Sequence, residues 1–350
     1  DLINSKPFYQ KKFILYRENQ PYDFMHEVIY QVDTAYGNKL VLTQPIRISF
    51  PKSPAEAVEK GAAYFTHIRP AQVIRNCGVE NLRVETEKFA SPMFTSGVAF
   101  TFAYACWIKN LYIYQTGSLP FQFHDAKNVE VRDCIFDKSW NTGGGGNGYC
   151  VFWRTHDGLM ENVTTFSLRH APNLQSFAGG CVVRNSEFYN NDAQWHGRWT
   201  HENLYENILV VSDENDDANY FLLSNELDDN IASHEPHLHG NVVYNSIFEM
   251  QRSDKMGAVL GGLYKDWVFA YNKFLIHSSA SIIEFGDWSD GVDFLGNNFG
   301  YMNYTSGYGV SFKGAFSTNV HRYTSIPSNN KNIRFINNGF YNMPTEKKFH

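Results

Sequence analysis

The sequence has no long apolar run, no large excess of charge of one sign and few cysteines, and each absence excludes a class of protein. No stretch of about 18 consecutive apolar residues occurs, so the sequence predicts no transmembrane span. The formal net charge is −6, whereas a nucleic-acid-binding surface needs an excess of lysine and arginine, so we expect no nucleic-acid partner. Hydrophobic residues make up 43% of the chain and no low-complexity tract interrupts them, which excludes a disordered protein.

Cysteine usage indicates packing rather than metal chemistry. The chain contains five cysteines and no CxxC pair, so the spacing typical of a structural zinc site is missing. Cys134 and Cys181 lie in or beside a repeated apolar pattern, where cysteine behaves as a small buried hydrophobe. Cys150 follows a loop, and one disulfide remains an open alternative there.

What the sequence does have is a repeat: an apolar pair, a spacer, an Asn or once an Asp, and then another apolar residue. The polar member recurs at intervals of 22 to 40 residues, which is the signature of a solenoid. Its occurrences are Asp133, Asn162, Asn185, Asn207, Asn245, Asn272, Asn297 and Asn337.

The choice of Asn predicts the kind of solenoid. Asn tolerates the left-handed backbone that a strand needs at a sharp corner, and stacked Asn amides can hydrogen-bond from coil to coil. We therefore expect an all-β fold, a single-stranded parallel β-helix of about nine or ten coils. In this fold Asn162, Asn185, Asn207 and Asn245 would stack at one inward corner. The 28 Phe, 21 Tyr and 26 Gly agree with β structure.

The repeat also predicts the domain boundaries. Residues 1–70 lack it, and within them 39–42 alternates like a strand while 54–64 has the pattern of a short helix. Because the open end of a solenoid exposes unpaired backbone, we expect residues 1–70 to cap the first coil. Residues 71–345 would form the β-helix domain.

One corner of the solenoid varies in length. It is long at 137–149 and 213–236 but short at 169–173 and 191–195, and insertions in a solenoid gather on the face that binds a ligand. We expect the short corners to form the floor of a cleft. The candidate catalytic residues around it are Arg169, His170, Asp192, His196, Arg198 and His201. The candidate substrate-binding residues are Trp140, Arg154, His156, Gln175, Trp195 and His237.

These residue types point to an anionic glycan. Arg can fork a carboxylate or sulfate, histidine can exchange a proton near neutral pH, and Trp offers a flat platform to a sugar ring. The glycine run 143–146 is not followed by the Lys-Ser/Thr of a phosphate-binding loop and indicates a backbone passing close to a neighbour.

We expect no metal and no cofactor, and two metal sites remain as weaker alternatives. An acidic loop could hold calcium through oxygen ligands; its residues are Asp213, Glu214, Asp216 and Asp217. A histidine cluster could hold zinc; its residues are His234, His237 and His239.

Residues 71–345 carry the Asn repeat, the corner of variable length and the Arg and His residues around it. In these features they resemble the right-handed β-helix superfamily of pectate-lyase-like carbohydrate-active proteins. In the alginate and chondroitin lyases of that superfamily an Arg-His pair after a strand is common, and Leu168-Arg169-His170 is similar. No Lys base or calcium-binding carboxylates that match those enzymes are evident here. The resemblance implies right-handedness, a polysaccharide or oligosaccharide substrate, and a secreted or periplasmic location.

Three functions follow from these residues. The first is a polysaccharide lyase, in which Arg169 or Arg198 neutralises a uronate and His170 or His196 takes its proton. The second is a glycoside hydrolase, which needs two carboxylates about 5–9.5 Å apart. Its candidate pairs are Asp192 with Asp213, Glu202 or Glu226. The third is a solenoid that binds glycans without cleaving them.

Overall fold

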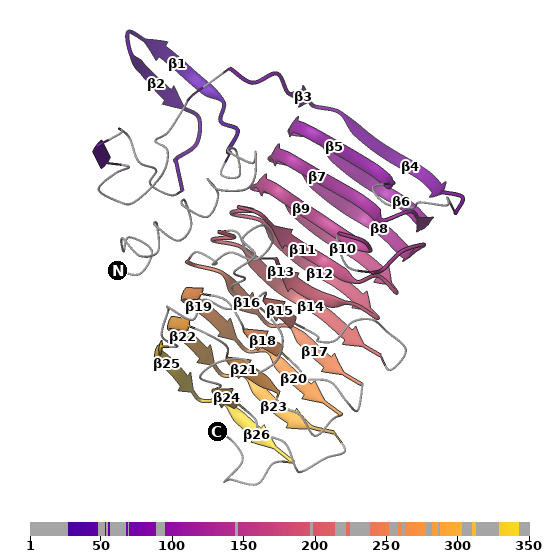
Figure 1. The fold of residues 1–350 in the computed structure, drawn as a ribbon, viewed down its shortest axis with the longest axis vertical. Helices are drawn as coiled ribbons and strands as arrows, with labels where there is room; N and C mark the ends of the chain where they lie inside the picture. Colours follow the sequence, from indigo (N-terminus) through magenta and orange to yellow (C-terminus); the bar gives the residue numbers. More distant parts are fainter. Residues whose placement is uncertain are drawn as a thin grey trace.

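The computed structural model is an all-β right-handed parallel β-helix, as the sequence predicts (Figure 1). Its coils stack along one axis from the purple N-terminal strands to the yellow C-terminal strands. The structure describes residues 27–47, 53, 55–56, 68, 70–88, 95–143, 146–196, 199–213, 222–224, 239–251, 258–260, 263–277, 282–285, 288–302, 310–312 and 329–342.

Two parallel sheets form the walls of the solenoid. The ten-stranded sheet contains β3 (Ile74–Arg75), β5 (Ser96–Tyr104), β7 (Leu119–Lys127), β9 (Tyr149–His156), β11 (His170–Gln175), β13 (Asp192–Trp195), β15 (Leu222–Ser224), β18 (Ala258–Leu260), β21 (Ile283–Phe285) and β24 (Val310–Phe312). Each strand pairs in parallel with its counterpart in the next coil.

The fourteen-stranded sheet covers the other walls. Its main path contains β4 (Gly78–Glu85), β6 (Trp107–Thr116), β8 (Glu130–Ser139), β10 (Leu159–Phe166), β12 (Val182–Tyr189), β14 (Leu204–Ser212), β16 (Val242–Tyr244), β19 (Leu263–Ala270), β22 (Trp288–Leu295) and β25 (Asn329–Ile336). In later coils the chain turns a corner after the main-path strand and continues as a second short strand of the same sheet. These second strands are β17 (Ile247–Met250), β20 (Lys273–Ile276), β23 (Asn298–Tyr301) and β26 (Gly339–Tyr341).

The predicted inward stack of Asn162, Asn185, Asn207 and Asn245 is wrong in its direction. All four side chains are exposed, although their backbones have the left-handed conformation expected at a corner, with φ between 48° and 54°. On the outer surface the Asn207 amide donates to Asn185 Oδ1 over 2.8 Å. Water can hydrogen-bond to an exposed amide, so these side chains do not need a partner in the neighbouring coil.

The inward position at this corner belongs to the following residue. Asn272 and Asn297 are buried, and the amide of Asn272 donates to Asn297 Oδ1 over 3.0 Å while Asn297 donates to Asn338 Oδ1 over 3.1 Å. The sequence repeat therefore combines two positions one residue apart. Because successive strand side chains point to opposite faces, a shift of one residue turns the Asn from inside to outside.

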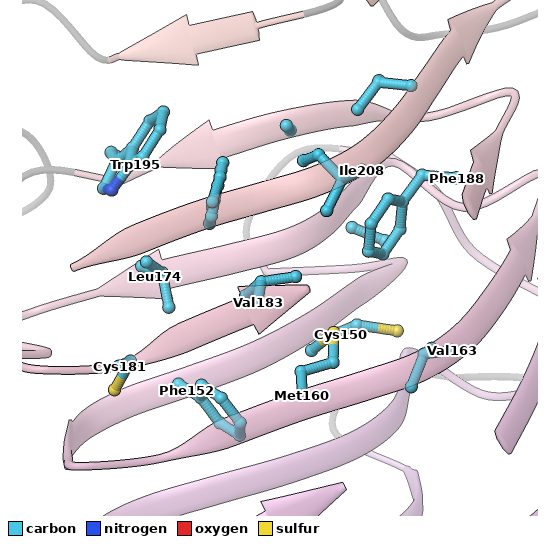
Figure 2. Close-up of a cluster of buried hydrophobic side chains, with 14 of the residues drawn as sticks. Cys150, Phe152, Met160, Val163, Leu174, Cys181, Val183, Phe188, Trp195 and Ile208 are labelled. Carbon is cyan, nitrogen blue, oxygen red and sulfur yellow. The ribbon is translucent and has the colours of Figure 1, made fainter. Parts of the chain in front are cut away.

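The core between the walls consists of stacked apolar rings and aliphatic side chains (Figure 2). Phe269 and Phe294 stack with centroids 4.8 Å apart, and Phe294 stacks on Phe335 at 4.6 Å. Cys134 and Cys181 are buried and all five cysteines are free thiols. The interpretation of cysteine as a small hydrophobe is therefore confirmed.

The N-terminal segment lies against the solenoid rather than within its coils. It contains an antiparallel hairpin of β1 (Val32–Tyr36) and β2 (Lys39–Leu42). Arg47 forms ion pairs with Asp157 and Glu202. The helix expected at 54–64 lies almost wholly outside the described residues, of which Ala55 and Glu56 are helical.

Candidate functional site

The candidate site lies where β9, β11 and β13 begin. Tyr149, His170 and Asp192 are the first residues of these strands and occupy one register, so Tyr149 pairs with His170 and His170 with Asp192. Neighbouring strands of a sheet lie about 4.8 Å apart, which brings the three side chains into a row on the outer face. All three are almost fully buried, between 2% and 4% exposed.

A carboxylate holds the central histidine. His170 Nδ1 lies 2.5 Å from Asp192 Oδ1, and an ionised carboxylate can only accept, so the Nδ1 hydrogen points at Asp192. The neutral imidazole then carries its lone pair on Nε2. This is the arrangement of an oriented general base.

Tyr149 packs against that histidine on the side of the preceding coil. The ring centroids of Tyr149 and His170 are 4.5 Å apart and their planes are inclined at 57°. Burial raises the pKa of Tyr149 to about 12, because desolvation disfavours the phenolate. The phenol is therefore protonated at neutral pH and can act as a proton donor. Sequence reasoning missed Tyr149, whose only signal was its position one residue after a glycine-rich loop.

Gly148 joins the start of β9 to the start of β11 through its carbonyl group. The Gly148 carbonyl accepts from the amides of Arg169 and His170, at 2.9 and 3.1 Å. Gly148 has φ of 72°, and a Cβ there would lie 2.9 Å from Arg169 N, so only glycine fits without strain. The expectation that this loop's backbone passes close to a neighbouring coil is confirmed at this position.

The other two expected residues of this corner lie nearby. The His196 ring is 6.4 Å from His170 and 6.0 Å from Tyr149. Arg169 is half-buried, and its Nη1 is buried without a hydrogen-bond partner among the described residues. A guanidinium with a buried donor left open is suited to a carboxylate ligand. Arg198 lies outside the described residues.

Further polar atoms continue from this corner along the outer face of β9 and β11. Asn173 Oδ1, Gln175 Oε1 and Trp153 Nε1 are buried and have no hydrogen-bond partner within the described part of the chain. Gln175 pairs in register with Trp153. A buried polar atom without a partner costs about 1–3 kcal/mol, so this row is a polar strip that continues from the candidate site.

Arg154 does not offer its charge to a ligand, contrary to the prediction. Its Nε and Nη2 bind the Asp125 carboxylate at 2.5 and 2.8 Å, and Nη2 also lies 2.9 Å from His124 Nε2. Asp125 is nearly fully buried, so the pair is compact. Burial lowers the pKa of His124. Arg154 is therefore neutralised within the protein, and its role is to orient His124.

His156 and His201 lie at the opposite end of the ten-stranded sheet, which corrects their assignment to the cleft. Both bridge to Gly179, and their rings are 5.8 Å apart. A Cβ on Gly179 would lie 2.5 Å from His201 Nε2, so the glycine makes room for the ring. Burial lowers the pKa of His201 to about 4 and that of His156 well below its usual range.

Neither predicted tryptophan platform lies over the candidate site. Trp195 points into the core, where its ring stacks on Tyr205 at 4.1 Å (Figure 2). Trp140 donates from Nε1 to the Thr86 carbonyl of an earlier coil, and the Lys88 ammonium lies over its ring. Trp153, whose ring lies 4.9 Å from that of His124 at an interplanar angle of 53°, is an aromatic side chain on the outer face instead. His237 lies outside the described residues.

Of the carboxylate pairs expected for a hydrolase, the structure separates Asp192 from Glu202 and places Asp213 at the corner of Asp192. Glu202 binds Arg47 at 2.7 Å at the far end of the sheet from Asp192. Asp213 follows β14 at the same corner as Asp192, one coil further along: the Ser212 hydroxyl donates to the Asn191 carbonyl over 2.6 Å. Glu226 lies outside the described residues.

The two alternative metal sites fall mostly outside the described residues. Of the calcium set the structure describes Asp213, and of the zinc set it describes His239. Within the described ranges, no group of three or more His, Cys, Asp or Glu side chains could hold a metal ion. No helix of the described residues is long and apolar enough to cross a membrane.

Comparison with known proteins supports the fold. No protein-family model matches the chain, and no curated protein matches it. A double mutant of the tailspike protein of E. coli bacteriophage HK620 aligns with a TM-score of 0.50 and 13% identity, covering 77% of this chain and 55% of its own. This chain thus spans about half the length of that tailspike.

Two further solved structures align with lower scores. The catalytic domain of a GH87 α-1,3-glucanase, solved with tetrasaccharides, aligns with a TM-score of 0.47 and 8% identity, covering 78% of this chain and 53% of its own. A mannuronan C-5 epimerase A-module from Azotobacter vinelandii aligns with a TM-score of 0.42 and 14% identity, covering 78% and 64%. The protein is a right-handed parallel β-helix, and the resemblance seen in the sequence is confirmed for its fold.

Proposed function

We propose that this protein is a carbohydrate-active enzyme that cleaves a uronate-containing polysaccharide by β-elimination at the corner of Tyr149, His170 and Asp192. One observation carries the proposal: a histidine oriented by a buried carboxylate lies in contact with a tyrosine that is protonated at neutral pH. These are the base and the acid that elimination needs.

Each group has a defined task. The Arg169 guanidinium neutralises the substrate carboxylate, which makes the proton on the adjacent C5 more acidic. His170 Nε2 takes that proton, and Tyr149 donates its hydroxyl proton to the departing glycosidic oxygen. Asp192 is a positioning residue that holds the His170 tautomer. His196 lies close enough to both rings to contact the substrate carboxylate.

The strip along β9 and β11 would hold neighbouring sugar units. Asn173 and Gln175 offer carbonyl oxygens to sugar hydroxyls, and Trp153 offers an N–H donor. Arg154 is already paired with Asp125, so this part of the strip has no free guanidinium for a second carboxylate. The anionic group is therefore selected at Arg169.

Elimination is favoured over hydrolysis by the partners of Asp192. A hydrolase needs one carboxyl group as acid and a second as base or nucleophile. Here the Asp192 carboxylate is bound to His170, and the groups in its register are an imidazole and a phenol.

The test is a digestion of uronate-containing, sulfated and neutral polysaccharides. We expect ultraviolet absorbance from an unsaturated sugar on uronate polymers. His170→Ala, His196→Ala and Tyr149→Phe should each lower turnover about 100-fold or more. His170→Ala should also lower the melting temperature, because it leaves the buried Asp192 carboxylate without its partner. His277→Ala, a substitution directly after β20, is the control.

The hydrolase alternative makes the opposite prediction. New reducing ends without the unsaturated product, lost in Asp192→Asn but kept in both histidine variants, would replace the lyase by a carboxylate-dependent hydrolase. Binding without any new reducing end would leave a glycan-binding solenoid.

A further inference from the structure

The contact between Tyr149 and His170 restricts how a sugar can meet them. Their ring centroids are 4.5 Å apart, which is van der Waals contact for two rings. Asp192 occupies the other edge of His170. Both side chains rise from adjacent parallel strands on the same outer face. A saturated sugar ring therefore has no room between the base and the acid.

A substrate must then lie over both groups and present one face to them. Taking the proposed elimination as its basis, we propose that this site performs syn elimination, in which the C5 proton leaves and the C4 oxygen is protonated on one face of the sugar. The substrate class is consequently a 4-linked uronate with its C5–H and C4–O4 bonds on the same side. Glucuronate and mannuronate have this configuration. Guluronate and galacturonate, in which the two bonds lie on opposite sides, do not.

The step balances without a further reactant. His170 Nε2 takes the proton from C5, and the electron pair of that bond forms the C4=C5 double bond. The C4–O4 bond breaks, and O4 takes the hydroxyl proton of Tyr149. The imidazolium then returns its proton to the phenolate across the ring contact. Both groups are restored, and the products are a new chain end with a hydroxyl and an unsaturated uronate.

The experiment compares four homopolymers: glucuronan and polymannuronate, which have the cis arrangement, and polyguluronate and polygalacturonate, which have the trans arrangement. Initial rates are followed by absorbance of the unsaturated product at equal concentrations of uronate. We expect cleavage of at least one cis polymer, at a rate about 100-fold or more above either trans polymer. Cleavage of a trans polymer as fast as the better cis polymer would overturn the syn assignment while leaving the lyase in place.

A tyrosine variant separates the two proton transfers. Tyr149→Phe removes the acid and keeps the ring against His170. In deuterated water we expect it to exchange C5–H of the cis polymer while cleavage falls about 100-fold or more. Tyr189→Phe, on the other sheet, is the matched control and should cleave normally. Exchange at C5 of the trans polymers instead would contradict a one-faced site. If neither exchange nor cleavage occurs on any uronate polymer, the lyase proposal itself fails.

Discussion

The histidines of this chain differ in what surrounds each ring, and the surroundings decide which of them can exchange a proton. His170 has a carboxylate on one nitrogen and lies at the candidate site. His124 contacts an arginine, and burial lowers its pKa. His201 donates from Nδ1 to the Trp199 carbonyl over 2.8 Å, and burial lowers its pKa to about 4. Of these three histidines, His170 is the one paired with a carboxylate beside a protonated phenol.

His201 should make the protein sensitive to acid. Its neutral form is favoured in the folded state, so its contribution is fully present above the unfolded pKa of about 6.5 and is lost as the pH falls through the folded value of about 4. The unfolding free energy of the native protein should fall as the pH drops between these values. In His201→Gln we expect this fall to be smaller by about 2–3 kcal/mol. Urea unfolding at pH 7, 5.5 and 4 measures it.

The control for this experiment is His277→Gln, directly after β20, which should keep the pH dependence of the native protein. An unchanged dependence in His201→Gln would mean that acid unfolding arises from other groups. The absolute stability of the variant is not the readout, because the glutamine also changes packing beside Gly179.

At the scale of the corner element, two neighbouring positions have opposite requirements. Asn297 is buried and its amide bonds both Asn338 and the Phe269 carbonyl. Asn185 is exposed with φ of 50°. The buried position needs a side-chain amide, whereas the exposed one needs tolerance of the left-handed backbone, which glycine also has.

These requirements predict different costs. Asn297→Leu should lower the unfolding free energy by about 2–4 kcal/mol, because it leaves several buried backbone groups unpaired. Asn185→Gly should change it by less than about 1 kcal/mol. Denaturant unfolding of both variants tests this. Equal losses in the two would show that the outer amides contribute as much as the inner ones.

A second element is a row of alternating charge on the fourteen-stranded sheet. Glu161 is nearly buried and lies between Arg132 and Arg184, which occupy the same register in the coils before and after it. Such a carboxylate is stabilised by its partners and costly to leave alone.

We predict that replacing one member of this row lowers the unfolding free energy more than replacing all three. Arg184→Met alone should lower the unfolding free energy by about 1–2 kcal/mol, discounted because the Arg184 side chain is 40% exposed. The triple variant Arg132→Met, Glu161→Leu and Arg184→Met should recover most of it. A triple variant less stable than the single one would indicate that the pairs contribute net stability.

At the scale of the whole molecule, the N-terminal segment (residues 27–47) is held by ion pairs to successive corners of the solenoid. Arg47 bridges Asp157 and Glu202. Its guanidinium lies over Gly180, where a Cβ would come within 2.4 Å of Nη2. The Lys127 ammonium lies 5.0 Å from the Tyr30 ring centroid. The contacts are polar and partly exposed, so the segment is held less firmly than the coils are held to one another.

Removing the Arg47 ion pairs should loosen the N-terminal segment and leave the coils folded. Arg47→Ala should increase the rate of limited proteolysis within residues 27–47 several-fold, while the unfolding free energy falls by about 1 kcal/mol or less. Gly180→Ala displaces the same guanidinium from the other side and should loosen the segment similarly, with an added cost of about 1–2 kcal/mol because φ at Gly180 is 68°. A large cooperative loss of stability in either variant would show instead that the segment and the solenoid unfold as one unit.

The candidate site was predictable in part, for a geometric reason. Arg169, His170, Asp192 and His196 lie beside short corners in two consecutive repeats, and stacking of repeats is enough to bring them together. His156 and His201 lie at the other end of the strands, because the distance along a strand from the corner was not determined by the repeat. Tyr149 was missed because its coil has a long loop of its own before the strand begins.

The sequence by itself determined that this protein is a parallel β-helix, because the repeat is a local property that every coil carries. Only the tertiary structure decided which way the Asn side chains point, since a shift of one residue exchanges the two faces of a strand. It also decided that Arg154 is paired with Asp125 and that Tyr149 contacts His170. Both contacts join residues 21 or more positions apart, whose meeting depends on the register between coils and on loop lengths that no single repeat contains.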